Sequence, residues 1–138
     1  MTNELHWLVL TILLTAVLWM PYIINRLFEG GILHGIWDPD GETTSNVPWA
    51  QRLMDAHINA VENLAVFAPL IIITHILEMN TELTATAAIL YFYARLAHAV
   101  LFTFRVPVLR IVAFLAGIQA RFISLIMREI GNIFRQET

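Results

Sequence analysis

The feature that most constrains this chain is a series of long apolar segments, each about as long as a membrane-crossing helix. The first is apolar almost without interruption from Trp7 to Ile24, close to the roughly 20 residues that a helix needs to cross a bilayer. Similar segments follow, so we expect helices at about 5–27, 48–78, 84–104 and 107–130. The sequence therefore predicts an all-α fold, a transmembrane four-helix bundle that forms one domain over residues 1–138.

Composition agrees with a membrane protein and excludes several kinds of site. Of the 138 residues, 58% are hydrophobic and 14% charged, against about 45–50% and 25% in soluble domains. The eight basic residues are all arginine, and with a net charge of −3 they form no basic patch that would favour nucleic acid. There is no cysteine, so any thiol chemistry requires a thiol brought by a ligand. No histidines have a metal-ligand spacing, and we expect no metal site.

The arginines predict how the chain crosses the membrane. Arg26 and Arg52 flank the first connection, and Arg105 and Arg110 flank the third. Because arginine concentrates on the cytoplasmic side, we expect these connections to face the cytoplasm and both termini to lie on the other side. In a bacterial cell this membrane would be the inner one.

A polar stripe follows the start of the second predicted helix. Its members are three, four and three residues apart and so share one helical face: Arg52, Asp55, Asn59 and Glu62. Ionisable groups at membrane depth are costly, and they are usually paired, line a cavity or serve a function. We therefore expect this stripe to line a functional cavity, whereas the neighbouring His57 caps a helix or lines an interface.

A second stripe with the same spacing follows the third predicted helix, and its members are Arg95, His98, Phe102 and Arg105. The short connection near residues 79–83 predicts that the second and third helices are antiparallel neighbours. Counting residues from that connection places Glu62 and Arg95 at similar depth, so we expect an ion pair between them. This pair would either serve only as a structural clasp or also contact a ligand. Tyr91 and Tyr93 are assigned to packing or to an interface.

Together the two stripes predict a polar cavity that opens to the cytoplasm. His98 is expected near Asn59, and Arg105, Arg52 and Arg110 at the cytoplasmic end. Arginine binds carboxylates through bidentate, charge-assisted hydrogen bonds, and a glutamate accepts from an ammonium group. The cavity thus suits a small ligand with several carboxylates and an amine, although Arg52 and Arg105 would also suit the lipid headgroups.

Two motifs resemble those of a known family. Residues 56–63, Ala-His-Ile-Asn-Ala-Val-Glu-Asn, are followed by Phe67 and Pro69, and residues 95–98, Arg-Leu-Ala-His, are followed by Arg105-Val-Pro107. In order and separation they resemble the helix-two and helix-three motifs of the MAPEG family, the membrane-associated proteins of eicosanoid and glutathione metabolism. The resemblance implies a homotrimer of four-helix subunits in membrane lipid, with glutathione bound between subunits near the cytoplasmic face.

The resemblance also implies an activity and roles for residues. It implies conjugating, peroxidase or isomerase chemistry on lipophilic substrates, with glutathione as co-substrate. Asn59, Glu62 and His98 match residues that contact glutathione, Arg95 matches an arginine that pairs with the glutamate, and Arg26 roughly matches an arginine near the end of helix one. As partners of the glutathione thiolate, the first candidate is Arg110, one position from the family's arginine, and the second is Arg105.

Some residues depart from the family pattern. Asp55 and Ile58 stand where the prostaglandin-synthase branch has arginines, and Phe102 where that branch has a tyrosine. Three functions therefore stay open: a glutathione transferase or peroxidase, a non-catalytic MAPEG-fold protein that binds lipid or regulates a partner, and a small transporter component.

Overall fold

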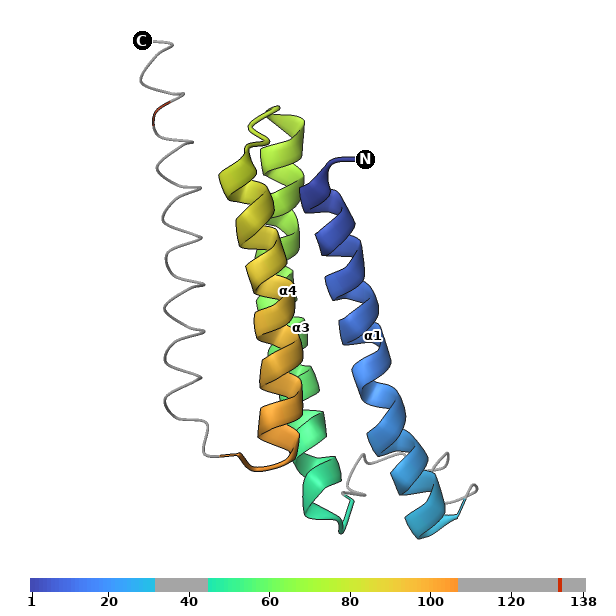
Figure 1. Ribbon diagram of the computed structural model, residues 1–138. Helices are drawn as coiled ribbons and strands as arrows, with labels where there is room; N and C mark the ends of the chain where they lie inside the picture. The colour runs from blue at the N-terminus through green and yellow to red at the C-terminus, as the bar shows by residue number, and fades with distance from the viewer. Residues whose placement is uncertain (32–44, 107–131, 133–138) are drawn as a thin grey trace.

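Three long helices form the part of the chain that the computed structural model describes, namely residues 1–31, 45–106 and Asn132. They are α1 (Asn3–Gly30), α3 (Pro48–Ile76) and α4 (Glu82–Thr103), and they lie side by side with alternating direction (Figure 1). Each is long and apolar enough to cross a membrane. The fourth expected helix, at about 107–130, lies outside the described residues.

The alternating direction gives the bundle two distinct ends (Figure 1). The N-terminus and the turn between α3 and α4 lie at one end, which we call the turn end. The last residue of α1, Gly30, and the first of α3, Pro48, lie at the other, which we call the loop end, together with the last residue of α4, Thr103. The polar stripe at the start of α3 is thus brought beside the end of α4.

Local sequence explains where the helices begin and end at the turn end. The Thr81 hydroxyl accepts from the backbone N–H of Thr84, and the Thr84 hydroxyl accepts from the N–H of Thr81, which is a capping box. Glu78, two residues after the end of α3, adopts a left-handed backbone conformation with φ of 55°. These two features turn the chain within a few residues and make α3 and α4 antiparallel neighbours.

Small residues allow the helices to approach closely. The seams bury alanines of α3 and α4, namely Ala50, Ala56, Ala60, Ala88 and Ala99. Small side chains at helix contacts let backbones come together in membrane proteins, where van der Waals packing drives association. Toward the turn end, the larger core side chains are Leu8, Phe67, Ile71 and Tyr91.

Four buried threonine hydroxyls are satisfied within their own helices. Thr11 donates to the Trp7 carbonyl at 2.8 Å, and Thr74 donates to the Leu70 carbonyl at the same distance. Thr15 and Thr103 likewise donate to the carbonyl four residues earlier. This back-bonding removes the cost of an unpaired polar group in an apolar surrounding.

A buried carboxylate joins α1 to α4 at the turn end. Glu4 is 2% exposed, and its Oε1 accepts a hydrogen bond of 2.6 Å from the Thr84 hydroxyl. The same threonine belongs to the capping box of α4. The start of α1 is therefore held against the start of α4 by one side chain on each helix.

Many large apolar side chains lie on the outward surface of the three helices. Large side chains that are exposed on this single chain include Leu13, Val17, Ile72, Ile73, Leu90 and Val100. Such a surface suits the hydrocarbon of a bilayer, where apolar side chains contact lipid without cost.

Candidate functional site

A buried arginine lies at the centre of the seam between α3 and α4. Arg95 on α4 is 7% exposed, and its Nη1 donates to the Asn59 Oδ1 on α3 at 2.9 Å. Asn63, one turn further along α3, donates from its Nδ2 to the Asn59 carbonyl at 2.6 Å. The structure therefore brings together Asn59 and Arg95, two of the residues that the sequence singled out.

The expected ion pair between Glu62 and Arg95 is absent from the described part of the chain. Glu62 is exposed, and the guanidinium of Arg95 pairs with the Asn59 amide instead. The reason is helical geometry: three residues turn a helix by about 300°, which leaves Glu62 about 60° away from the face that Asn59 presents to α4. The residues of the stripe share a broad face of α3, but only part of that face contacts α4.

Tyr91, which the sequence assigned to packing or to an interface, completes the surroundings of Arg95. The ring of Tyr91 stacks on that of Phe67, with centroids 3.7 Å apart and planes 8° apart, and the Arg95 guanidinium carbon lies 5.9 Å from the Tyr91 centroid. Among the described residues the Tyr91 hydroxyl and the Arg95 Nε are buried and have no hydrogen-bond partner. The spacing of four residues from Arg95 was the signal that placed Tyr91 on the same face.

His98 follows Arg95 by one turn and is half-buried. Its ring stacks on Phe102, with centroids 5.5 Å apart and planes 12° apart. His98 thus extends the polar row of α4 from Arg95 toward the loop end, and Phe102 covers one face of the imidazole.

The arginines at the loop end have separate environments. The Nε of Arg52 donates to the Thr103 carbonyl at 2.8 Å, which satisfies one of the last carbonyls of α4. Arg105 was expected on the same helical face as Arg95, but α4 ends at Thr103, and Arg105 is exposed with a left-handed φ of 54°. That expectation was wrong because the chain leaves the helix before Arg105. Arg110 lies outside the described residues.

Arg26 lies near the end of α1 beside a polar contact that the sequence did not predict. It lines a small hollow together with Tyr22, Ser45 and Gln51. The Tyr22 hydroxyl and the His57 Nδ1 are 2.9 Å apart and join α1 to α3. His57 therefore lines an interface between helices, which is one of the two roles expected of it.

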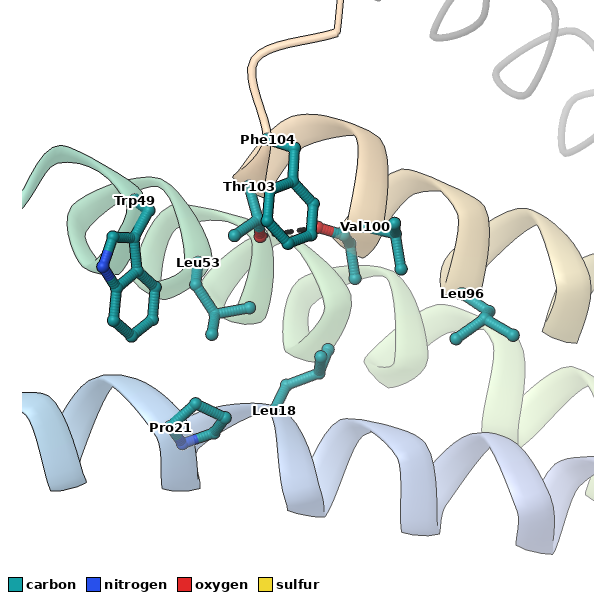
Figure 2. Close-up of a pocket in the computed structure, with 9 residues that line it drawn as sticks. Leu18, Pro21, Trp49, Leu53, Leu96, Val100, Thr103 and Phe104 are labelled. Atoms are coloured by element: carbon teal, nitrogen blue, oxygen red, sulfur yellow. Dashed lines mark hydrogen bonds between the residues drawn. The ribbon is translucent and has the colours of Figure 1, made fainter.

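An apolar cavity of about 490 Å³ lies between the three helices toward the loop end (Figure 2). No polar surface lines it. It reaches from Trp49 on α3 to Leu96 on α4, and Pro21 on α1 forms part of its wall, as Figure 2 shows. The residues that line it are Leu18, Pro21, Trp49, Leu53, Leu96, Ala99, Val100, Thr103 and Phe104.

Polar and apolar parts adjoin at this end of the bundle. Thr103 lines the apolar cavity, and its carbonyl accepts from Arg52. The arrangement places a partly buried cation, Arg52, next to a residue that lines a space for a hydrocarbon group. Over residues 1–31 and 45–106, no group of three or more histidine or acidic side chains is placed to hold a metal ion.

Comparison with known proteins gives one match. The sequence model of the MAPEG family matches residues 5–127, most of the chain. No curated protein and no solved structure matches.

Proposed function

We propose, from the premise that this chain belongs to the MAPEG family, that it is a glutathione-dependent membrane transferase or peroxidase. Membership supports a membrane function linked to glutathione or to eicosanoid metabolism, and with three span-length helices among the described residues the protein is an integral membrane protein. The proposed substrates are lipophilic electrophiles or hydroperoxides that arrive from the bilayer.

One observation carries the proposal: Arg95 is buried in the α3–α4 seam with an amide as its hydrogen-bond partner and no carboxylate among the described residues. Removing a cation from water is costly unless it is paired and hydrogen-bonded. The folded protein therefore gains stability when an anionic ligand supplies the negative charge that balances Arg95. Glutathione has two carboxylates and an ammonium group.

The residues divide by the part of glutathione that they suit. Arg95 and Asn59 suit a carboxylate in the seam, and the exposed Glu62 suits the ammonium group. Arg26 and Arg52, toward the loop end, suit the other carboxylate. The proposed binding residues are therefore Arg26, Arg52, Asn59, Glu62, Arg95 and His98.

A neighbouring subunit would complete this site. Glu62 is exposed on the single chain, and Ile58, one turn earlier on α3, is an exposed large apolar residue. The charged Glu62 does not suit contact with lipid, and the apolar Ile58 does not suit contact with a charged ligand. A homotrimer that covers this face of α3 would enclose the ligand between two subunits.

The proposed chemistry starts from a thiolate. A cysteine thiol has a reference pKa of about 8.5, and a nearby arginine favours its ionised form. Arg110 is the first candidate for that arginine, and the exposed Arg105 is the second. In conjugation, the sulfur bonds to an electrophilic carbon whose leaving group takes the electron pair. In peroxidase turnover, two glutathione molecules supply two electrons, giving an alcohol, water and glutathione disulfide.

The apolar cavity provides a place for the lipophilic substrate. It lies between α1, α3 and α4, and Thr103 joins it to the environment of Arg52. A hydrocarbon group gains about 25 cal/mol for each Å² that it removes from water, so a lining without polar groups favours apolar substrates over polar ones.

The second candidate function is a non-catalytic MAPEG-fold protein that binds lipid or regulates a partner. Phe102 favours it, because this residue packs on His98 and brings no hydroxyl to the site. Asp55 and Ile58 are exposed on α3 and bring no positive charge where one branch of the family has arginines.

A melting experiment separates the two functions. A ligand that binds only the folded state raises the melting temperature, so we expect millimolar glutathione to stabilise the detergent-solubilised protein. Glu62→Gln should remove most of this shift, whereas Glu78→Gln, an exposed glutamate in the turn, should keep it. Thiolate absorbance at neutral pH then tests the chemistry.

If glutathione gives no shift in the wild type, the non-catalytic function takes its place. A shift without thiolate absorbance would retain binding and remove the proposed thiolate mechanism.

A further inference from the structure

We propose that Tyr91 contacts the ligand directly, as one of two buried donors, with Arg95, for a single carboxylate. This inference rests on the proposed function, because it identifies how that ligand's carboxylate is held. Tyr91 was not among the residues that the sequence or the family resemblance assigned to binding.

The first reason is that both donors are buried and have no partner. Tyr91 is 4% exposed and Arg95 is 7% exposed, and neither the Tyr91 hydroxyl nor the Arg95 Nε has a hydrogen-bond partner among the described residues. Five threonines buried within the same three helices donate to a carbonyl or to Glu4. A buried polar group without a partner lowers stability, so the unpaired Tyr91 hydroxyl requires an explanation that Thr11 or Thr74 does not.

The second reason is the way in which Arg95 is already engaged. Its Nη1 donates to Asn59, which leaves the edge formed by Nε and Nη2. That edge is one of the two forks with which a guanidinium holds both oxygens of a carboxylate. The Asn59 contact therefore orients the arginine and leaves the Nε of its carboxylate-binding edge without a hydrogen-bond partner among the described residues.

The third reason is that the Tyr91 ring is held rigidly. It stacks on Phe67 across the seam at 3.7 Å, and the Arg95 guanidinium lies near its face. Side chains on a helix lean toward its N-terminus, so Arg95 leans toward the turn that carries Tyr91. A donor fixed before the ligand arrives loses little entropy on binding.

The experiment compares Tyr91→Phe with Tyr93→Phe, which removes the same hydroxyl from a residue of α4 that is 54% exposed. Binding is measured by calorimetry in detergent with glutathione and with its analogue in which a methyl group replaces the thiol. We expect Tyr91→Phe to melt at or above the wild-type temperature without ligand, because the stack on Phe67 is kept and an unpaired hydroxyl is removed. We expect its Kd for both ligands to rise at least about tenfold, as for the loss of a hydrogen bond to a charged group.

The carboxylate is tested with glutathione diester, in which neither carboxylate is charged. The diester should bind the wild type and Tyr91→Phe with equal affinity, and Tyr93→Phe should match the wild type with every ligand. If Tyr91→Phe binds glutathione as tightly as the wild type does, the hydroxyl serves only packing or a bound water, and the inference is overturned.

Failure of the proposed function gives a different result. If glutathione does not bind the wild type, glutarate, a dicarboxylate without amine or thiol, is tested in the same way. Stabilisation by glutarate that Tyr91→Phe weakens would retain the carboxylate site and remove glutathione as its ligand. No binding of either compound to the wild type overturns the inference as well.

Discussion

The Nη1 of Arg95 lies 2.9 Å from the Oδ1 of Asn59, and this hydrogen bond joins α4 to α3. The contact places a full positive charge against a neutral amide, so the charge itself remains unbalanced among the described residues. An anionic ligand is the partner that this arrangement best suits.

The hydrogen bond between these residues should contribute to stability. Asn59→Ala leaves a buried guanidinium N–H unpaired, and we expect it to lower the free energy of unfolding by about 1.5–3 kcal/mol. Glu62→Ala, one turn away and exposed, should change it by less than about 0.5 kcal/mol. Titration with sodium dodecyl sulfate in mixed micelles measures both, and equal effects would show that the contact has no energetic role.

Thr84 should stabilise the bundle through the carboxylate of Glu4. Thr84→Val removes both the donor to a carboxylate that is 2% exposed and the acceptor of the Thr81 N–H in the capping box, and we expect a loss of about 1–3 kcal/mol in the free energy of unfolding. Thr86→Val is the matched control, because Thr86 is exposed and donates only to the carbonyl of Glu82. If thermal melting in detergent ranks the two variants equally, the tie between α1 and α4 is not stabilising.

The contact between Tyr22 and His57 should stabilise the packing of the C-terminal half of α1 against α3. Tyr22→Phe keeps the ring and removes the hydroxyl that lies 2.9 Å from the His57 Nδ1. We expect a loss of about 0.5–1.5 kcal/mol, read as a lower melting temperature. Limited proteolysis of the α1 segment should also be faster in this variant, and an unchanged cleavage rate would contradict the role in anchoring α1.

Filling the apolar cavity should weaken the binding of the lipophilic substrate and leave the binding of glutathione unchanged. Val100→Trp adds a large side chain at the rim of the cavity, and Leu90→Trp adds one at a position outside its lining that is equally exposed, at 47%. We expect Val100→Trp to raise KM for a lipophilic electrophile at least about tenfold, as for the loss of a buried apolar group. The glutathione-induced melting shift should stay unchanged in both variants.

A rise in KM that is the same for Leu90→Trp and Val100→Trp would assign the effect to the lipid-facing surface. The apolar cavity would then have no part in substrate binding.

The sequence alone determined that this is a helical membrane protein, and it located the segments that became α1, α3 and α4. Hydrophobic length decides this, since a segment of about 20 apolar residues has few alternatives to a membrane-spanning helix. Local patterns also placed Asn59 and Arg95 on helical faces, because side-chain direction repeats every 3.6 residues. The two motifs were sufficient to identify the MAPEG family.

Only the tertiary structure decided which residues of each stripe meet. Spacing places Asn59 and Glu62 on one broad face, but the rotation of α3 against α4 selects Asn59 as the partner of Arg95 and leaves Glu62 outside. The same packing places Tyr91, an aromatic residue of the core, beside Arg95, whose charge has no carboxylate partner among the described residues. A sequence specifies the angular position of each side chain on its own helix, whereas contact between helices depends on their relative rotation and depth, which are set by packing over the whole seam.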